Sequence, residues 1–469
     1  MNMCQCQFRR PGIGFLYRLA FFAWVILPTL AQAATVKVLY NFTTSTGANP
    51  TTGLLLSGNL LYGGTLNGGS SSDGAVFKIP TNNAAGYSDF FNFGGGNGGA
   101  NPTGGPLVLT NGLLYGTTEN GGTNSRGMVY QVSASGANFK DLYSFSAENS
   151  NGYNQDGANP MAGVLLSGKT LYGTTSAGGA GAYPYGTIFR VNLDGTGFTN
   201  LYNFNGPDGK TPQGSLILSG NTLYGATAFG GTDPSGWGTL FKINTDGSGF
   251  SSFYSFNSGS GNAPNGGLVL SGNTLYGTTS NGGPGTGGAV FRVNTDGTDF
   301  TNLYSFTQDN SGNAPNGTEP SEGLVLSGNT LYGTTSNGGS AHFGVLFAIN
   351  TDGSGFTNLF NFSYSTSGEN PYGLILASNT LYGVTIHGGS SGAGTIFYLA
   401  IPPPQVPPVP IPLGIRLNDT VIVLSWTNPA FSLWAAPTCS GIYTNVAGAT
   451  SPYTNSFSGR QQFFRLQAN

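Results

Sequence analysis

The sequence predicts an all-β protein whose main part is a seven-bladed β-propeller, closed by an N-terminal strand and followed by a small C-terminal β module. Three observations predict this fold class. The motif Leu-Tyr-Gly occurs seven times, a proline precedes each copy, and short apolar runs alternate with glycine-rich turns. A spacing of about 50 residues between copies is typical of a repeat architecture. The motif tyrosines are Tyr62, Tyr115, Tyr172, Tyr224, Tyr276, Tyr332 and Tyr382, and the prolines are Pro50, Pro102, Pro160, Pro212, Pro264, Pro320 and Pro371.

The chain begins with a segment typical of a secretory signal. Three arginines precede or interrupt the apolar run FLYRLAFFAWVILPTLAQA, which ends in small residues at Ala31-Gln32-Ala33. We expect residues 1–33 to be a signal peptide, and the mature protein to be secreted, periplasmic or on the cell surface, without a membrane span. A membrane anchor is the alternative, although the apolar stretch from Leu19 to Leu30 is short for a span.

The composition argues against nucleic-acid binding and against an internal disulfide. The chain carries 15 basic and 18 acidic residues, and three of the basic ones lie in the predicted signal. The mature protein is therefore acidic, which argues against binding of nucleic acid. Only Cys439 remains after removal of the signal, so an internal disulfide cannot form. We expect a monomer that is stabilised by packing.

Each repeat reads as four short strands, most clearly in the fifth copy. Its proline stands before the first strand, where the missing N–H costs no ladder hydrogen bond. Gly272-Asn273 suits a type II′ turn between strands one and two, and Asp296-Gly297 suits a type I′ turn between strands three and four. The four predicted strands are 267–271, 274–280, 289–294 and 300–306.

Strands this short, apolar on both faces, need a neighbour on each side, and radial stacking of blades supplies it. A solenoid is the alternative, but its repeats are normally shorter and need caps. The seventh repeat stops after its third strand, 394–400, whereas Val36 to Phe42 has the pattern of a fourth strand. We therefore predict a propeller over residues 34–402 whose last blade is completed by residues 36–42. Its blades start near residues 50, 102, 160, 212, 264, 320 and 371.

The repeat also resembles a known family. The pattern P-x-G-L-V-L-S-G-N-T-L-Y-G-T-T-S-N-G-G, followed by G-x-V-F-R-V-N-T-D-G-T-G-F-T-N-L-Y-S-F, is similar to the bacterial tandem-repeat family called Gloeo/Verruco, or GloVer. The resemblance covers residues 34 to 402 and is most specific in repeats three to six. The first two repeats depart from it at the third turn, where they read PTNNAAGYSDF and SASGANF. It implies an exported protein, variously anchored, and no assigned activity.

Beyond the repeats, proline dominates. Residues 403–412 read as a semi-rigid proline-rich linker. Residues 413–469 read as a small all-β module with apolar runs that begin at Val421, Leu433, Ile442 and Gln461. A role in sorting or surface attachment is one hypothesis for this module, and a purely structural end domain is the other.

Variable loops carry the candidate binding residues. By analogy with other propellers, the loops between strands two and three share one face with those that lead from strand four to the next blade. Rings among Gly, Ser, Thr and Asn there predict a glycan- or peptide-binding surface. Alternatively, the rings only cover the blades. The candidate ligand-binding residues are Tyr183, Tyr185, Phe229, Trp237, His342, Phe343 and His387.

The sequence lacks the groups that catalysis in a propeller channel requires. The positions expected at the channel mouth include one carboxylate, Glu322, whereas glycosidases use a pair. We therefore expect a non-catalytic recognition or cell-surface scaffold protein. A carbohydrate-active enzyme, a glycosidase or lyase with an unrecognised channel site, is the alternative. The other six positions at the mouth are Thr52, Gly104, Ala162, Gln213, Asn265 and Tyr372.

No cofactor is predicted with a clear motif. The two histidines lie in different loops without a metal-binding spacing. Calcium stays open, because two long loops, Ser146 to Asn159 and Thr307 to Glu322, contain carboxylates among amides and glycines. These carboxylates are Asp156, Asp309, Glu319 and Glu322.

Overall fold

The structure is a computed structural model, and the residues that it describes fall into two units. One unit is Ala33–Ile401, and the other contains Pro402–Asn469 together with the first 32 residues. The predicted signal peptide and the proline-rich linker lie outside the described residues. Within the described part of the chain, no helix is long and apolar enough to cross a membrane. The structure describes residues 35–147, 149–150, 153–180, 184–309, 312–320, 322–401, 414–418, 421–425, 431–436, 444–446, 449–456 and 463–468.

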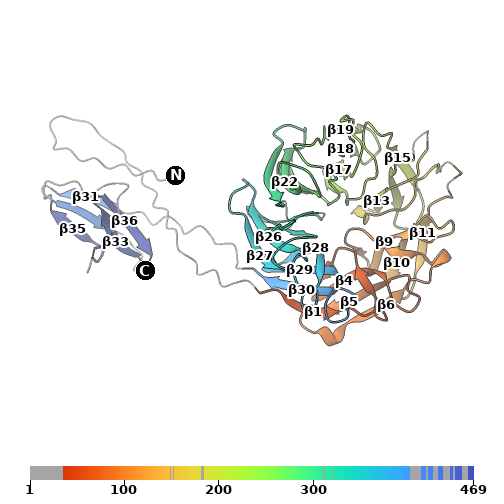
Figure 1. The fold of residues 1–469 in the computed structure, drawn as a ribbon, viewed down its shortest axis with the longest axis horizontal. Coiled ribbons are helices and arrows are strands. Elements are labelled where there is room, and N and C mark those ends of the chain that lie inside the picture. The colour runs from red at the N-terminus through yellow and green to blue at the C-terminus, as the bar shows by residue number, and fades with distance from the viewer. Residues whose placement is uncertain are drawn as a thin grey trace. The chain divides into compact units, whose positions relative to one another are not determined.

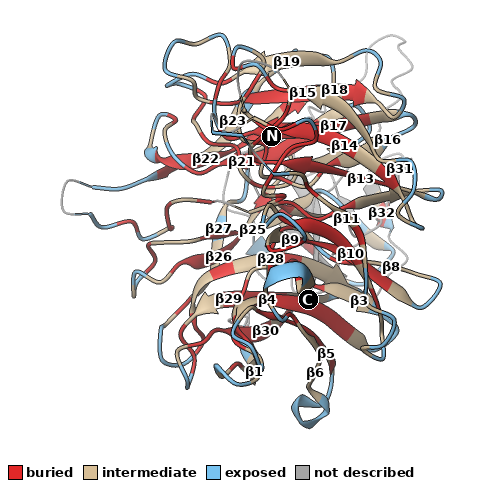
Figure 2. Cartoon of the chain, turned by 90° about the vertical axis from the view of Figure 1, so that its right-hand side faces the viewer, coloured by how far each residue is buried: buried red, intermediate tan, exposed pale blue. Residues whose placement is uncertain are grey.

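Seven antiparallel sheets stand around one axis and form the blades of a propeller (Figure 1). In blades 1 to 6 the chain runs outward, from a first strand near the axis to a fourth strand at the rim, and in blade 7 the fourth strand comes from the N-terminal end. The strand interiors are buried and the connecting turns are largely exposed (Figure 2). The seven-bladed all-β fold predicted from the repeats is therefore confirmed.

The strands of the first four blades follow the repeat closely. In blades 1 and 2 the first strand is split into two short pieces, and two 3-10 turns, η1 (Ala84–Gly86) and η2 (Gly96–Gly98), flank the last strand of blade 1. Blade 1 comprises β2 (Ala48–Pro50), β3 (Leu55–Ser57), β4 (Leu60–Asn67), β5 (Ala75–Pro80) and β6 (Ser88–Asn92). Blade 2 comprises β7 (Ala100–Pro102), β8 (Val108–Thr110), β9 (Leu113–Asn120), β10 (Met128–Ser133) and β11 (Lys140–Ser144). Blade 3 comprises β12 (Leu165–Ser167), β13 (Thr170–Thr175), β14 (Thr187–Asn192) and β15 (Thr199–Asn203), and blade 4 comprises β16 (Ile217–Ser219), β17 (Thr222–Thr227), β18 (Thr239–Asn244) and β19 (Ser251–Ser255).

The remaining blades complete the ring. Blade 5 comprises β20 (Val269–Ser271), β21 (Thr274–Thr279), β22 (Thr286–Asn294) and β23 (Thr301–Thr307). Blade 6 comprises β24 (Val325–Ser327), β25 (Thr330–Thr335), β26 (Val345–Asn350) and β27 (Thr357–Asn361). Blade 7 comprises β28 (Glu369–Ala377), β29 (Thr380–His387), β30 (Thr395–Ala400) and, from the N-terminal end, β1 (Lys37–Asn41).

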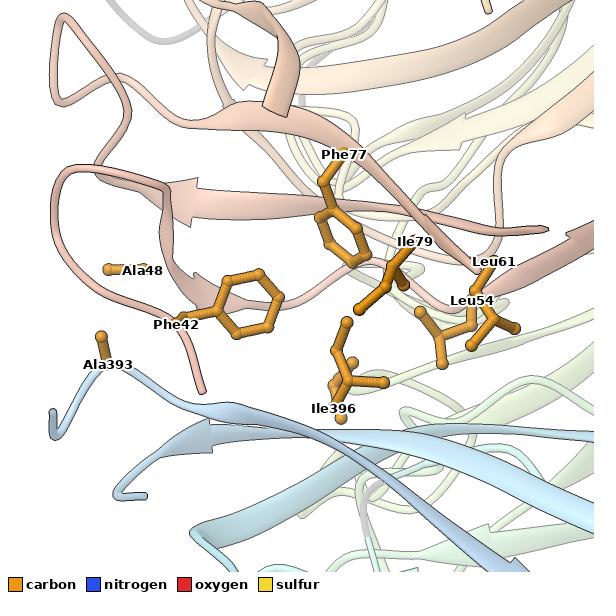
Figure 3. Close-up of a cluster of buried hydrophobic side chains, with 9 residues drawn as sticks. Phe42, Ala48, Leu54, Leu61, Phe77, Ile79, Ala393 and Ile396 are labelled. Atoms are coloured by element: carbon orange, nitrogen blue, oxygen red, sulfur yellow. The ribbon is translucent and has the colours of Figure 1, made fainter. Parts of the chain in front are cut away.

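Strand β1 closes the ring, as the sequence predicts. It pairs antiparallel with β30, with Lys37 opposite Tyr398 and Asn41 opposite Thr395. The following residue, Phe42, has no exposed surface, and its ring lies 5.2 Å from that of Phe77 in blade 1. Figure 3 shows Phe42 between side chains of the first and last blades. The two ends of the repeat region are thereby joined in one core.

The Leu-Tyr-Gly motif is explained by packing inside and between blades. All seven of its leucines have no exposed surface. Its glycine lies opposite an aromatic residue of the third strand, as Gly277 does opposite Phe291. A methyl group on Gly277 would lie 2.6 Å from Cζ of the Phe291 ring, so the motif requires a glycine there. The recurrence of the motif therefore reflects structure.

Of the two predicted types of hairpin turn, the structure confirms the first and contradicts the second. Gly272 has φ of 58° and Asn273 is not among the residues with positive φ, as in a type II′ turn. At the third turn Gly297 has positive φ but Asp296 does not, and Asn294 N–H donates to the Thr298 carbonyl. This pattern is a three-residue loop with glycine in the left-handed position, so the predicted type I′ turn at Asp296-Gly297 is wrong.

Stacked rings join neighbouring blades at the rim. In each pair, an aromatic residue of a fourth strand stacks on a ring that follows the third turn of the next blade. The ring centroids lie 3.5 to 4.6 Å apart. The pairs are Tyr40–Tyr87, Phe91–Phe139, Tyr143–Phe198, Tyr202–Phe250, Tyr254–Phe300 and Tyr304–Phe356.

The C-terminal module contains two small antiparallel sheets, with strand orders β31-β32-β35 and β34-β33-β36. Leu424 in one sheet and Leu433 in the other are almost fully buried. The all-β module predicted for this region is thus present. Its strands are β31 (Gly414–Asn418), β32 (Val421–Ser425), β33 (Phe431–Ala436), β34 (Thr444–Asn445), β35 (Tyr453–Ser456) and β36 (Phe463–Ala468).

Candidate functional site

Two sets of loops meet on one face of the propeller, which we call the upper face. They are the loops between strands two and three of a blade and those that lead from strand four into the next blade. Thr211 N–H donates to the Tyr185 carbonyl at 2.9 Å, and Ala263 N–H donates to the Trp237 carbonyl at 3.1 Å. Each of these hydrogen bonds joins one loop of each set. The described residues that were predicted to bind a ligand are carried by this face.

Three of the candidate aromatic residues occupy the same position in their repeats, directly before the glycine that opens the third strand. Each ring is partly exposed and packs on the hydrophobic cluster between its blade and the next: Tyr185, Trp237 and Phe343 all do so. These rings therefore both cover the core and contribute to the upper face. The other four repeats carry Asp73, Arg126, Gly287 and Ala393 at this position.

Phe229 differs from these rings because it is 52 % exposed. It stands just past the second strand of blade 4, where an apolar ring gains little from packing. Phe229 and Tyr364 are the large hydrophobic residues that are exposed in the described part of the chain. The equivalent residues of the other repeats are Asn67, Asn120, Ala177, Asn281, Asn337 and His387.

Lys210 lies beside Phe229 and was not predicted from the sequence. The two residues form an antiparallel bridge: Lys210 N–H donates to the Phe229 carbonyl at 2.7 Å, and Phe229 N–H to the Lys210 carbonyl at 3.1 Å. Directly opposed residues of such a bridge project on the same side. Lys210 Nζ also lies 4.7 Å from the centroid of the Tyr185 ring.

Tyr185, Lys210, Phe229 and Trp237 form what we call the blade 4 patch. Trp237 joins it through a bridge to Gly230, the residue after Phe229. A comparison of the repeats could have found Lys210, because no other repeat has a basic residue two positions before its proline. The equivalent residues are Ala48, Ala100, Ala158, Asn262, Thr318 and Glu369.

The remaining candidates lie outside this patch. Tyr183 is not among the residues that the structure describes. His342 is exposed on blade 6. The ring centroid of its neighbour Phe343 lies 5.8 Å from that of Tyr364. Tyr364 is 43 % exposed, and the sequence interpretation missed it. His387 belongs to a polar ladder, because its Nδ1 lies 2.7 Å from Asn49 Nδ2. The structure therefore does not unite the seven predicted residues in one site.

The ladder around His387 runs across three blades of the upper face. Asn67 Nδ2 donates to Asn49 Oδ1 at 3.2 Å, Asn101 Nδ2 to Asn67 Oδ1 at 3.4 Å, and Asn120 Nδ2 to Asn101 Oδ1 at 3.1 Å. These amides satisfy one another and tie blades 7, 1 and 2 together. This side of the face is polar, whereas the blade 4 side carries aromatic rings.

The centre of the ring is closely packed at the end where the first strands begin. A methyl group on Gly105 of blade 2 would lie 2.0 Å from Ser215 Oγ of blade 4, and one on Gly266 would lie 2.5 Å from the Glu322 carbonyl carbon. Burial raises the pKa of Glu322 well above its usual value, although a hydrogen bond from Tyr372 partly offsets this shift. Among the described residues near the axis, Glu322 thus faces a tyrosine and has no second carboxylate beside it.

The carboxylates considered for calcium are used within the fold. Asp156 accepts hydrogen bonds from the Tyr143 hydroxyl at 2.6 Å and the Ser146 amide at 3.0 Å. Glu319 Oε2 accepts one from Asn337 Nδ2 at 2.8 Å. Within the described ranges, no three His, Cys, Asp or Glu side chains are grouped so that they could hold a metal ion.

Comparison with solved structures supports the propeller. The GH74 xyloglucanase from Xanthomonas campestris is 12 % identical, with a TM-score of 0.50, and the match covers 84 % of this chain and 59 % of that one. An oligogalacturonate lyase in complex with manganese is also 12 % identical, with a TM-score of 0.47 and coverage of 81 % and 96 %. At such identities the likeness concerns the fold alone. No sequence among the curated proteins matches the chain.

A family model describes the repeats themselves. The model of the Gloeobacter/Verrucomicrobia repeat matches residues 12–182, 148–319 and 311–404. These matches span most of the chain, including all seven blades and strand β1. The family resemblance noted in the repeat motif is therefore confirmed, and the chain belongs to the Gloeobacter/Verrucomicrobia repeat family.

Proposed function

We propose that this protein is exported and acts as a non-catalytic recognition or surface scaffold protein, binding a glycan or a peptide through the blade 4 patch. One observation carries the proposal. Where the other six repeats have small or polar residues, blade 4 has Lys210 and Phe229, and Trp237 lies next to them through its bridge to Gly230. Departures from a repeat are expected where function requires them, because the scaffold is already specified by the remaining copies.

The exposure of Phe229 is the strongest support. A phenylalanine that is 52 % exposed leaves apolar surface in water, which costs solubility and contributes little to stability. Such a ring can stack on the apolar face of a sugar or on a peptide side chain. The adjacent bridge to Lys210 holds its backbone in place, so the ring is presented by a rigid element.

Two features support recognition over catalysis. Propeller enzymes place their carboxylates near the axis, and here closely packed glycines occupy the axis at the end where the first strands begin. Glu322 lies beside Tyr372 in this region, and burial favours its protonated form. A glycosidase would need a second carboxyl group at a defined separation.

Glycan and peptide arrays probed with the mature protein test the proposal. We expect hits that Phe229→Asn weakens by about 1–3 kcal/mol, because asparagine is the residue found in other repeats and removes the ring. The melting temperature should stay unchanged, since Phe229 is exposed. The matched control is Tyr364→Asn, which removes the other exposed aromatic ring of the described chain, in the loop after blade 6. This variant should leave binding intact. An absence of hits on both arrays, or full binding by Phe229→Asn, would refute the blade 4 patch as the binding surface.

Export is tested separately by locating the full-length protein in fractions of the producing cell. We expect the protein outside the cytoplasm, shortened at its N-terminus. Full-length protein confined to the cytoplasm would contradict export.

A further inference from the structure

We propose that the ligand of the blade 4 patch is an acidic carbohydrate, a uronic acid polymer or oligosaccharide whose carboxylate pairs with Lys210. This inference rests on the proposed function and adds the chemical class of the ligand. It depends on the environment of one ammonium group and on the backbone beneath it.

The environment of Lys210 differs from that of other lysines in the repeats. Lys78, Lys140 and Lys242 each donate to a backbone carbonyl of the next blade, at 2.6 to 3.1 Å. Those lysines are thereby used in joining blades. For the Lys210 ammonium, the contact found within the described residues is the face of the Tyr185 ring at 4.7 Å.

The carboxylate closest to Lys210 in sequence, that of Asp208, is already engaged. Asp208 lies two residues before Lys210, accepts a hydrogen bond from the Tyr202 hydroxyl, and accepts another from the Asn205 amide at 2.9 Å. Both oxygens of this carboxylate thus accept hydrogen bonds from the segment that precedes blade 4. Lys210 is partly buried and lies over the Tyr185 ring, while the Asp208 carboxylate is bonded to other groups. The Lys210 ammonium group can therefore pair with an anionic group of a ligand.

The neighbouring ring of Phe229 indicates which kind of molecule carries the anionic group. Phe229 projects on the same side as Lys210 and exposes half of its surface. Stacking on the C–H face of a pyranose ring uses this surface, and a carboxylate attached to the sugar then reaches the ammonium group. A neutral sugar can offer hydroxyl oxygens to the ammonium group, whereas a carboxylate forms the stronger, charge-assisted hydrogen bond with it.

The backbone favours a sugar over an acidic peptide. Peptides bound in extended form commonly pair with an open strand edge. Here the N–H and carbonyl groups of Lys210 and Phe229 are bonded to each other, and Thr211 N–H is bonded to the Tyr185 carbonyl. The patch therefore offers side chains, which suits a carbohydrate.

Isothermal titration calorimetry on the mature full chain tests this inference. The probes are tetrasaccharides of uronic acids, their carboxyl-reduced neutral counterparts, and a glutamate-rich peptide. We expect an acidic tetrasaccharide to bind about tenfold more tightly than its neutral counterpart. Lys210→Gln should abolish that preference, and Lys210→Arg should retain it. Lys169→Gln, which removes the same charge from an exposed turn at the end of the blades opposite the patch, is the control and should leave the preference unchanged.

The outcomes separate this inference from the proposed function. Equal binding of acidic and neutral sugars overturns the inference and leaves the recognition function in place. Stronger binding of the acidic peptide overturns the assignment to carbohydrate in the same way. If none of the probes binds and the arrays also give no hit, both proposals fail. A preference that survives in Lys210→Gln refutes the role of Lys210.

Discussion

Tyr130 differs from the equivalent residues of the other repeats by one atom, its hydroxyl oxygen. In six blades a phenylalanine of the third strand fills the space above the motif glycine, and in blade 2 Tyr130 fills it. Its side chain is fully buried, its hydroxyl group has no hydrogen-bond partner among the described residues, and burial raises the pKa of that hydroxyl. A buried polar group without a partner costs about 1–3 kcal/mol.

We therefore expect Tyr130→Phe to increase the free energy of unfolding by about 1 kcal/mol, because it removes the unpaired hydroxyl and keeps the ring. Urea denaturation followed by fluorescence measures the change. Phe77→Tyr is the reciprocal control in blade 1, since Phe77 lies opposite Gly63 in the same way, and it should lower the stability. A lower denaturation midpoint for Tyr130→Phe would contradict this account.

The candidate site was predictable residue by residue only in part. Aromatic residues in the variable loops identified Tyr185, Phe229 and Trp237 as candidates, but they did not indicate which ring would be exposed. Exposure depends on whether a cluster between two blades lies beneath the ring, which no local pattern reveals. Lys210 was missed for a related reason: its contact is Tyr185, which belongs to the preceding blade.

Turns show the same limit among structural elements. Gly272-Asn273 and Asp296-Gly297 are both typical hairpin pairs, and only the first forms the predicted turn. In the second, the hydrogen bond from Asn294 to Thr298 closes a loop that is one residue longer. An Asp-Gly pair fits both loops, so the sequence predicted the hairpin without fixing its type.

A second recurring element joins the blades on the upper face. The glycine that opens each third strand faces the proline before the first strand of the next blade. A methyl group on that glycine would lie 2.6 to 2.9 Å from the proline Cδ at all seven junctions, including Gly394 with Pro50 at the closure. This contact explains why both residue types recur, since each repeat supplies one half of it.

We expect Gly186→Ala to destabilise blade 3 strongly, because φ is 98° and the new methyl group would lie 2.2 Å from the Thr175 carbonyl oxygen. Gly168→Ala in the same blade is the matched control, because Gly168 also has positive φ, 61°, but its methyl group would meet no atom within 4 Å. The control should cost about 1–2 kcal/mol from backbone strain alone, and Gly186→Ala clearly more. Thermal unfolding of both variants measures the difference, and equal losses would show that the close contacts of Gly186 with Thr175 and Pro212 are unimportant.

For the whole molecule, the period of the repeat determined the architecture. Seven copies, each too thin to form a core alone, require neighbours on both faces, and the missing fourth strand of the last copy identified the closure. The junction between blades 6 and 7, to which the N-terminal segment also contributes, differs from the other six. Val36 takes the place that an aromatic ring holds at the six stacked junctions, and it packs with Phe360 in the cluster between blades 6 and 7.

The last prediction concerns this closure. Deletion of residues 36–42 should open the ring, because it removes strand β1 and the buried side chain of Phe42, and leaves β30 as a bare strand edge. Each buried apolar side chain that is lost contributes roughly 1.5–3 kcal/mol. We expect a much lower melting temperature and aggregation through the open edge, measured by circular dichroism and light scattering. The matched control is a chain that ends after Pro403, which keeps every strand of the seven blades and should unfold at the temperature of the intact propeller. If the N-terminal deletion melted at that same temperature without aggregating, strand β1 would not be what holds the ring closed.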